Sequence, residues 1–263
     1  MTKKKLKLKK SVIKVFLILV FSGTLVYSVF QVYKWQQDNK KVSALNKKLE
    51  EKAPQTATDV LIDDNGAPAV ASLVETTIDE LKNINKDIVG WIKINNTNIN
   101  YPIVQTKNND YYLNHSFDKT KNKAGWIFAD YKNSLDEVDK NIILYGHNRI
   151  DGSMFGTLKT TFRKEWLNDK TNYYISLNIN NKNYIYKVFS IYETPLEDYY
   201  LKKEFASNEE YLAFLITIES RSIHNFKPVL KVEDKILTLS TCSNNNQSRL
   251  VLHAKLLYEK QVE

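Results

Sequence analysis

The sequence is poor in cysteine and glycine. Its 263 residues include one cysteine, Cys242, and seven glycines, which do not cluster. One thiol excludes an internal disulfide and a paired-cysteine metal site. The chain also lacks a glycine-rich phosphate loop, a His-Glu-x-x-His zinc motif and a Gly-x-Ser-x-Gly nucleophile elbow. We therefore expect neither a metal ion nor a cofactor.

Acidic residues are absent from the first 34 positions. This segment contains eight lysines, which account for the whole formal net charge of +8. The remaining residues, 35–263, therefore carry 30 basic and 30 acidic groups. Residues 35–263 thus have no net charge, and the excess of basic residues typical of a nucleic-acid-binding domain is missing from them. We therefore expect no nucleic-acid partner.

An apolar run accompanies these lysines. The 19 residues from Val15 to Tyr33 carry no charge, and a helix rising about 1.5 Å per residue nearly crosses a hydrocarbon core of about 30 Å over that length. Lysines stay on the cytoplasmic side, so the rest of the chain is expected outside the cell membrane. The alternative is a cleaved signal peptide, but the run is long for one and no Ala-x-Ala-like site follows it. The sequence predicts a cytoplasmic basic tail over residues 1–10 and a single-pass transmembrane signal-anchor helix over residues 11–34.

Residues 35–75 have the composition of an extracellular linker. Residues 39–52 can continue as a short helix, whereas residues 53–72 contain turn formers and lack an apolar period. We expect no regular structure in the latter. The predicted catalytic domain then occupies residues 76–263.

Two helices are expected in this domain. Thr77-Ile-Asp-Glu80 has the spacing of a capping box and begins a helical apolar pattern. Ser207-Asn-Glu-Glu210 is a second capping box, and it begins a helix of about three turns. Its apolar stripe consists of Tyr211, Phe214, Leu215 and Ile218. We interpret this stripe as core packing, on a helix inserted between the late strands.

The rest of the domain is a series of β-branched and aromatic segments separated by turns. The predicted strands are residues 88–94, 99–105, 125–130, 140–145, 184–192 and 236–242, and a last strand that begins at Arg249. This series predicts a mainly β fold with peripheral helices, in which a mainly antiparallel sheet closes into a barrel.

Cys242 ends the predicted strand Ile236-Leu-Thr-Leu-Ser-Thr-Cys242. Side chains alternate along a strand, so Cys242 shares a face with Thr238 and Ser240, opposite the apolar face that should meet the core. A lone cysteine is most often a small buried hydrophobe. Outside the cell, however, it is either buried and inert or a reactive thiol. A short loop leads to Arg249, which would lie beside the thiol.

A nucleophilic cysteine needs a histidine nearby. A thiol with a pKa of about 8.5 is only a few per cent thiolate at neutral pH. The chain has four histidines, His115, His147, His224 and His253. His147 lies at the exit of an apolar strand, whereas His253 lies on the last strand with the same parity as Arg249. Each one alone is more often structural than catalytic, and the pattern favours His147 over His253 only slightly.

Arg249 also has two interpretations. It is either an ordinary surface or ion-pair arginine, or a donor to a carbonyl oxygen that gains negative charge during acyl transfer. The second role suits a guanidinium because it is permanently charged and presents several N–H donors.

Two separated motifs together resemble a known family. Thr238-Leu-Ser-Thr-Cys242 with Arg249 downstream, and Tyr145-Gly-His-Asn148 upstream, resemble the signature of sortases, the surface transpeptidases of Gram-positive bacteria. The resemblance covers about residues 76–258 and is strongest to class B sortases. The segments that resemble class B in particular are Tyr112-Leu-Asn114 and Asp151-Gly-Ser-Met-Phe-Gly156.

The resemblance implies a closed eight-stranded barrel with Cys242, His147 and Arg249 at one end of a groove. It implies that Cys242 attacks the carbonyl after threonine in a C-terminal sorting signal and forms a thioester acyl-enzyme. His147 would protonate the leaving amine and then deprotonate an amine of a peptidoglycan precursor, while Arg249 holds the oxyanion or the substrate backbone. The family has no corresponding role for His253. The expected partners are surface proteins with a sorting signal, the precursor amine, and the membrane through the N-terminal helix.

The resemblance also implies substrate-binding residues, namely Ser240, Tyr145 and Asn114, and a groove wall formed by residues 194–200. Strand parity independently places Ser240 on the face of Cys242. The sequence departs from the family at Ser243, where some class B members carry an acidic residue. This departure leaves the substrate preference open.

Two other functions remain compatible with the sequence. One is a wall-directed Cys/His hydrolase, although papain-like forms place the cysteine before the histidine and the order here is reversed. The other is a non-enzymatic anchored β-barrel binding module with a buried cysteine. Labelling of Cys242 by a thiol probe would distinguish the binding module from both enzymes.

Overall fold

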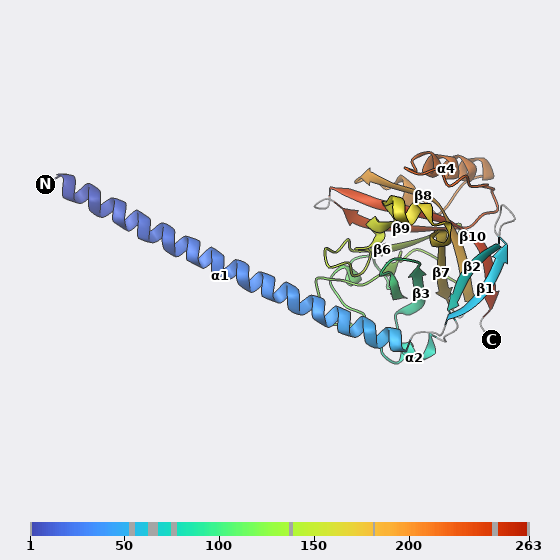
Figure 1. The fold of residues 1–263 in the computed structure, drawn as a ribbon, viewed down its shortest axis with the longest axis horizontal. Coiled ribbons are helices and arrows are strands. Elements are labelled where there is room, and N and C mark those ends of the chain that lie inside the picture. The colour runs from blue at the N-terminus through green and yellow to red at the C-terminus, as the bar shows by residue number, and fades with distance from the viewer. Residues whose placement is uncertain are drawn as a thin grey trace. The chain divides into compact units, whose positions relative to one another are not determined.

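The fold was analysed in a computed structural model, which describes residues 2–52, 56–62, 68–74, 78–136, 139–180, 182–243 and 247–261 (Figure 1). Residues 1–42 and residues 43–263 form two compact units, and each is described by itself. The helices are α1 (Thr2–Glu51), α2 (Asp79–Lys82), η1 (Tyr111–Leu113), η2 (Leu158–Phe162), α3 (Lys164–Asn168), η3 (Lys170–Tyr173), η4 (Tyr199–Leu201) and α4 (Asn208–Ser220). The strands are β1 (Thr56–Ile62), β2 (Pro68–Val74), β3 (Ile88–Ile94), β4 (Asn100–Val104), β5 (Phe128–Ala129), β6 (Asn141–Gly146), β7 (Tyr174–Ile179), β8 (Lys182–Pro195), β9 (Ile236–Ser243) and β10 (Ser248–Gln261).

Helix α1 contains the apolar run. Within Lys10–Glu51 it has an 18-residue window with a mean hydropathy of 2.2, and none of that window is buried. Length and composition therefore allow it to cross a membrane, although a signal sequence near an N-terminus has the same properties. The helix continues through residues 39–52, as the sequence predicts, and Asn46 near its end donates a hydrogen bond to the carbonyl of Asn100 at 3.4 Å.

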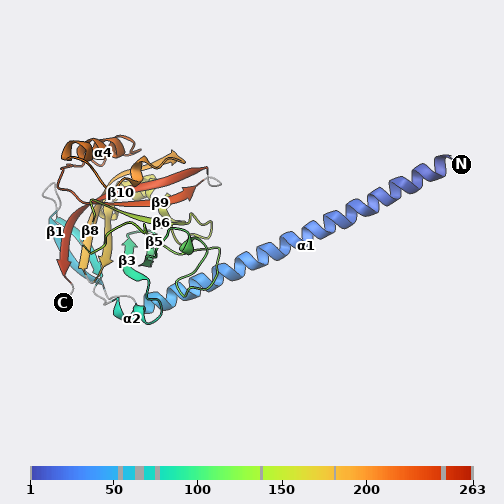
Figure 2. The same ribbon diagram turned by 180° about the vertical axis from the view of Figure 1, so that it is seen from behind.

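Eight strands close into a barrel in the order β10-β8-β7-β3-β4-β5-β6-β9. The pairs β4–β5 and β6–β9 are parallel, and the other neighbouring pairs are antiparallel. The prediction of a mainly antiparallel, closed, eight-stranded barrel with peripheral helices is confirmed. Figure 2 shows the same barrel from behind, with α4 outside it in both views.

The predicted strands differ from the structure in two places. Strand β7 was missed, although it alternates apolar with polar side chains and all six of its residues are buried. The predicted strand 125–130 is reduced to the two residues of β5. Gly125 explains the reduction, because its φ of +63° is incompatible with a strand, and the amide of Trp126 bonds to the carbonyl of Tyr112 instead of a strand neighbour.

Helix α4 forms as the second capping box predicts. The Ser207 hydroxyl accepts a hydrogen bond from the amide of Glu210 at 3.2 Å, and the Glu210 carboxylate accepts one from the amide of Ala206. The predicted stripe of four apolar residues is buried. It packs with residues of three strands, namely Phe189 and Tyr192 of β8, Ile236 of β9 and Val251 of β10. The helix thus covers the outer side of this part of the sheet.

The segment before the barrel contains a hairpin. Strands β1 and β2 pair antiparallel from Thr56–Val74 to Ile62–Pro68, where the composition predicted no regular structure. Apolar and β-branched residues on both strands favour this pairing over an irregular chain. The first capping box falls partly on Thr77, which lies outside the described residues, and α2 follows as one short turn in which Leu81 is buried.

Candidate active site

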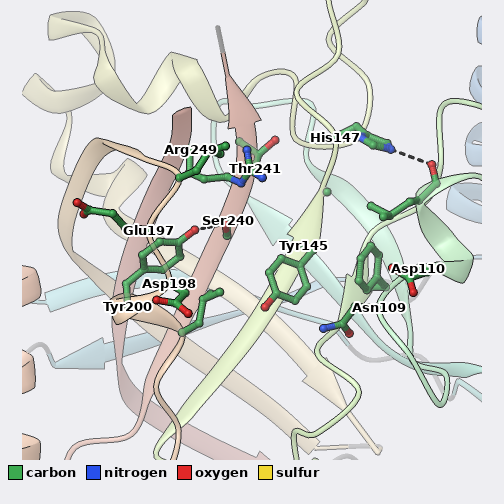
Figure 3. Close-up of a pocket in the computed structure, with 15 residues that line it drawn as sticks. Asn109, Asp110, Tyr145, His147, Glu197, Asp198, Tyr200, Ser240, Thr241 and Arg249 are labelled. Atoms are coloured by element: carbon green, nitrogen blue, oxygen red, sulfur yellow. Dashed lines mark hydrogen bonds between the residues drawn. The ribbon is translucent and has the colours of Figure 1, made fainter. Parts of the chain in front are cut away.

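A pocket of about 780 Å³ lies at one end of the barrel (Figure 3). Its lining comes from the ends of β5, β6, β9 and β10, from the short helices η1 and η4, and from the loops that precede these two helices. The lining residues are Asn109, Asp110, Leu113, Phe128, Tyr145, Gly146, His147, Leu196, Glu197, Asp198, Tyr200, Leu201, Ser240, Thr241 and Arg249. This set includes four of the six predicted site residues, and Cys242 follows Thr241 directly in the chain.

The pairing of β6 with β9 brings the histidine and the cysteine to the same end of the barrel. These strands run parallel, with Tyr145 opposite Ser240 and Gly146 opposite Thr241. His147 is the first residue after β6, and Cys242 is the next residue on β9. Two parallel strands end at the same sheet edge, so the two backbones leave the pairing together. The structure describes the backbone of Cys242 but not its side chain, so the strand pairing alone locates this residue.

The pairing of β9 with β10 brings the arginine to the cysteine. These strands are antiparallel, and Arg249 is directly opposite Cys242. Side chains of directly opposed residues lie on the same face of a sheet. Among the described residues the half-buried Arg249 guanidinium pairs with no carboxylate, and its Nη1 donates to the carbonyl of Ser248 at 3.1 Å. The predicted side-by-side placement of Cys242 and Arg249 is confirmed for the backbone.

His147 is held by a backbone carbonyl. Its Nε2 lies 2.8 Å from the Leu113 oxygen, and Figure 3 shows the imidazole pointing toward that atom, away from Arg249. A carbonyl only accepts hydrogen bonds, so Nε2 carries a proton. In the neutral ring Nδ1 then has the lone pair, and this nitrogen can exchange a proton with a reacting group.

Gly125 packs directly against this histidine. A Cβ added at Gly125 would lie 2.9 Å from His147 Cδ2 and 3.0 Å from the Leu113 carbonyl oxygen. The residue also has a φ of +63°, which glycine adopts without the steric cost that other residues incur. Only glycine therefore fits at this position without displacing the imidazole or its carbonyl partner.

Tyr145 is fixed by a buried carboxylate. Its hydroxyl donates to Asp130 Oδ2 at 3.0 Å, and Asn109 Nδ2 donates to the same oxygen at 2.9 Å. Burial alone would raise the pKa of Asp130. Hydrogen bonds from the Lys132 amide, Asn109 and Tyr145, and the charge of Lys203 with Nζ at 3.6 Å, instead hold that pKa below its ordinary value. Burial and the adjacent carboxylate raise the pKa of Tyr145, so this hydroxyl stays a donor. Asp130 thus links three separate segments at the pocket edge.

Ser240 lies where strand parity predicts. It lines the pocket, and its Oγ is 2.9 Å from the hydroxyl of Tyr200. Two details differ from the alternation argument. Thr238, on the same face, is fully buried below the pocket, and Thr241, on the opposite face, also lines it.

Asn114 does not line the pocket. Its side chain is exposed at the end of η1, whereas Asn109, Asp110 and Leu113 from the same segment are part of the lining. Asn109 was not predicted at the site, because it reaches the pocket edge through a tertiary hydrogen bond to Asp130 that no local pattern records. Of the predicted wall 194–200, Leu196, Glu197, Asp198 and Tyr200 line the pocket.

The other three histidines lie outside the lining. The His115 ring stacks on Tyr111 at 4.0 Å between centroids, and the Nε2 of His224 is 3.2 Å from the Tyr173 hydroxyl. His253, which strand parity left as a rival to His147, is fully buried, and burial lowers its pKa to about 3. Within the described part of the chain no group of three or more acidic, histidine or cysteine residues is arranged to hold a metal ion.

Comparisons with known proteins agree with this geometry. The sortase domain family model matches residues 92–257. Sortase B of Listeria monocytogenes is 36% identical over 215 residues, which cover 79% of this chain and 87% of the relative. Sortase B of Staphylococcus aureus is 35% identical over 189 residues, 70% of this chain and 76% of the relative. The crystal structure of sortase B from Bacillus anthracis in complex with AAEK2 superposes with a TM-score of 0.69 at 37% identity, covering 84% of this chain and 96% of that one.

The chain belongs to the sortase family. Sortases are cysteine transpeptidases of the cell surface, which act on surface proteins with a sorting signal and on cell-wall precursors. The relatives are named Sortase B, so the resemblance to class B that the motifs indicate is confirmed. Membership of this family argues against the non-enzymatic binding module, because sortases are transpeptidase enzymes.

Replacement of Gly125 tests how this sortase holds its histidine. We expect Gly125→Ala to displace the His147 ring and to lower kcat/KM for a sorting-signal peptide by at least about tenfold, because misplacing a catalytic group by about 1 Å costs up to about a hundredfold. Peptide turnover and the ring resonances of His147 in NMR spectra measure the effect. Gly23→Ala is the matched control, since nothing lies within 4 Å of a Cβ there. Unchanged turnover and unchanged His147 resonances in Gly125→Ala would contradict this account.

The buried His253 makes stability depend on pH. Its pKa is about 3 in the folded chain and about 6.5 in an unfolded one. The unfolded state therefore binds the proton first as pH falls, and stability present above pH 6.5 is lost progressively down to about pH 3. Between pH 7 and pH 5 we expect His253 to account for a loss of about 2 kcal/mol in the free energy of unfolding. Urea unfolding should show this extra loss in the wild type relative to His253→Gln, and equal losses in both would contradict it.

Proposed function

We propose that Cys242 is the nucleophile of this transpeptidase, with His147 as its acid–base partner and Arg249 as the donor to the developing oxyanion. The observation that carries the proposal is the register of three neighbouring strands. The parallel pairing of β6 with β9 and the antiparallel pairing of β9 with β10 bring all three positions to one barrel end, at the rim of the pocket.

The first half-reaction is acylation. The Cys242 sulfur attacks the carbonyl carbon after threonine in the sorting signal, and its proton passes to His147. The carbonyl oxygen becomes negatively charged in the tetrahedral intermediate, beside the guanidinium of Arg249. The C–N bond then breaks, the leaving amine takes the proton from His147, and a thioester joins the protein to Cys242.

The second half-reaction is transfer. An amine of a peptidoglycan precursor attacks the thioester carbonyl while His147 accepts its proton. The C–S bond breaks, the proton returns to the sulfur, and a new amide bond attaches the surface protein to the cell-wall precursor. A hydrolase would use water at this step, which is the remaining alternative to transfer.

The groove that receives the peptide has polar contacts on both sides. We propose Ser240 and Tyr145 as substrate-binding residues, because both line the pocket and each is oriented by a hydrogen bond, to Tyr200 and to Asp130. The proposal for Asn114 rests on the resemblance alone, since its side chain is exposed outside the lining.

The N-terminal helix supports membrane attachment. We propose that residues 1–10 are cytoplasmic, that residues 11–34 span the membrane once and that residues 35–75 link this anchor to an extracellular catalytic domain over residues 76–263. Eight lysines without an acid in the first 34 residues favour this orientation.

Peptide trapping on the full-length chain in detergent tests the catalytic assignment. A library of peptides with threonine at the cleavage position should leave a mass on Cys242 equal to the acyl fragment. His147→Ala and Cys242→Ala should each abolish turnover, and Arg249→Ala should lower it by about a hundredfold to a thousandfold. His224→Gln, outside the pocket lining, is the histidine control. An acyl mass on another residue, or wild-type turnover in His147→Ala, would contradict the proposed catalytic roles of Cys242 and His147.

The same assay separates transfer from hydrolysis. With an amine acceptor present, the product of a transpeptidase carries the acceptor mass. If water remains the only acceptor across a panel of cell-wall amines, the hydrolase alternative replaces the transfer step.

The single cysteine allows a direct test of topology. We expect a membrane-impermeant maleimide to label Cys242 on intact cells that express the full chain, because the catalytic domain is outside. Labelling should require no permeabilisation, and the Cys242→Ala variant should give no signal. Labelling that occurs only after the cells are opened would reverse the proposed orientation.

A further inference from the structure

Four buried polar side chains lie beneath the pocket, on four different strands. They are Tyr192 of β8, His253 of β10, Thr238 of β9 and Asn141 of β6, and each is at most 2% exposed. The Tyr192 hydroxyl is 2.9 Å from His253 Nε2, and His253 Nδ1 is 2.9 Å from Thr238 Oγ1. Thr238 Oγ1 is in turn 2.6 Å from Asn141 Oδ1. The reaction proposed above uses none of these groups.

The hydrogen bonds of this set all point the same way, from Tyr192 as the first donor to Asn141 as the last acceptor. Asn141 Nδ2 donates to the carbonyls of Tyr200 at 3.2 Å and Lys202 at 2.9 Å, so its Oδ1 must be the acceptor for Thr238. The Thr238 hydroxyl has one proton, which it gives to Asn141, and Nδ1 of His253 therefore donates to Thr238. Because burial lowers the pKa of His253 to about 3, the ring is neutral and Nε2 accepts from Tyr192.

The set ends at the pocket wall. Asn141 holds the backbone of η4 at Tyr200, just before the chain turns toward α4. The Tyr200 ring lines the pocket, its hydroxyl meets Ser240 Oγ at 2.9 Å, and it packs edge-on to His253 at 6.4 Å between centroids. The buried set thus contacts both the backbone and the ring of Tyr200, which is hydrogen-bonded to Ser240 in the pocket wall.

We propose that Tyr192, His253, Thr238 and Asn141 form a positioning network that sets the place of Tyr200 and hence the shape of the pocket wall that Tyr200 and Ser240 form together. These residues act through Tyr200 and do not touch the substrate. The role rests on the proposed function, in which the peptide binds along Ser240. It also assigns a task to His253, the histidine that the reaction leaves unused.

Thr238 is the residue at which a substitution can remove hydrogen bonds of the network with the smallest change in side-chain volume. Thr238→Val keeps the side-chain volume but removes the hydroxyl, which leaves both Asn141 Oδ1 and His253 Nδ1 without their partner. Thr238→Ser keeps the hydroxyl and is the matched control. Both variants are made in the full-length chain in detergent.

Hydrogen exchange and kinetics then give independent measurements. In Thr238→Val we expect amide exchange to rise about tenfold at residues 199–202 but not in β3, β4 and β7, which lie away from the network. For the peptide that acylates the wild type, KM should rise about fivefold, because both hydrogen bonds of the Thr238 hydroxyl are lost and Tyr200 is held less firmly, while kcat stays within about twofold. The alkylation rate of Cys242 by iodoacetamide should not change, and Thr238→Ser should match the wild type in every measurement.

Three results would overturn the proposal: exchange at residues 199–202 unchanged in Thr238→Val, exchange raised equally throughout the barrel, or kcat lowered with KM unchanged. If no peptide acylates the wild type, the proposed function fails, and the exchange measurement still decides the network. If Thr238→Val does not fold, Tyr192→Phe interrupts the network at its other end. Raised exchange at residues 199–202 in that variant supports the network, and wild-type exchange overturns it.

Discussion

The parallel pairing of β6 with β9 is the constraint on which the site depends. It places residues that are 97 positions apart, Asn141 and Thr238, in hydrogen-bond contact inside the domain. It also places His147 and Cys242 at the same sheet edge, one residue beyond the last paired positions. A slip of one residue would turn every side chain of β9 to the opposite face and would end the register that pairs Cys242 with Arg249. The apolar residues that pack on the other face oppose such a slip.

The sheet at β9 and β10 uses its two faces differently. Side chains alternate, so Leu237 and Leu239 point away from the α4 side and into the barrel, whereas Ile236 and Val251 pack under the helix. The polar side chains of Tyr192, His253, Thr238 and Asn141 are buried on the α4 side as one hydrogen-bonded set, which avoids the cost of unpaired buried donors and acceptors among them. Asp130 follows the same rule with a charge, because four donors or cations compensate the burial of its carboxylate. The pocket is therefore built on groups whose orientation is specified by their partners.

Local patterns predicted much of the fold. The capping box at Ser207 fixed the start of α4, the apolar stripe fixed its buried face, and alternation placed Ser240 at the pocket. The motifs around His147 and Cys242 indicated the family. Three features needed the tertiary structure. The extent of β5 depends on the backbone of Gly125, the pocket role of Tyr200 depends on contacts with Ser240 and Asn141, and the burial of His253 depends on strands from both sides. None of these is encoded within one stretch of sequence.

The connection between β6 and β9 also has a consequence for how the domain forms. Parallel strands cannot be joined by a tight hairpin, and here the crossover contains β7, β8 and α4. Contacts between such distant segments close a long loop and form slowly compared with local ones. In a newly made chain, Cys242 therefore remains apart from the end of β6 until this crossover has folded back. The rate at which the crossover closes thus sets how long the single thiol of the chain has no folded structure around it.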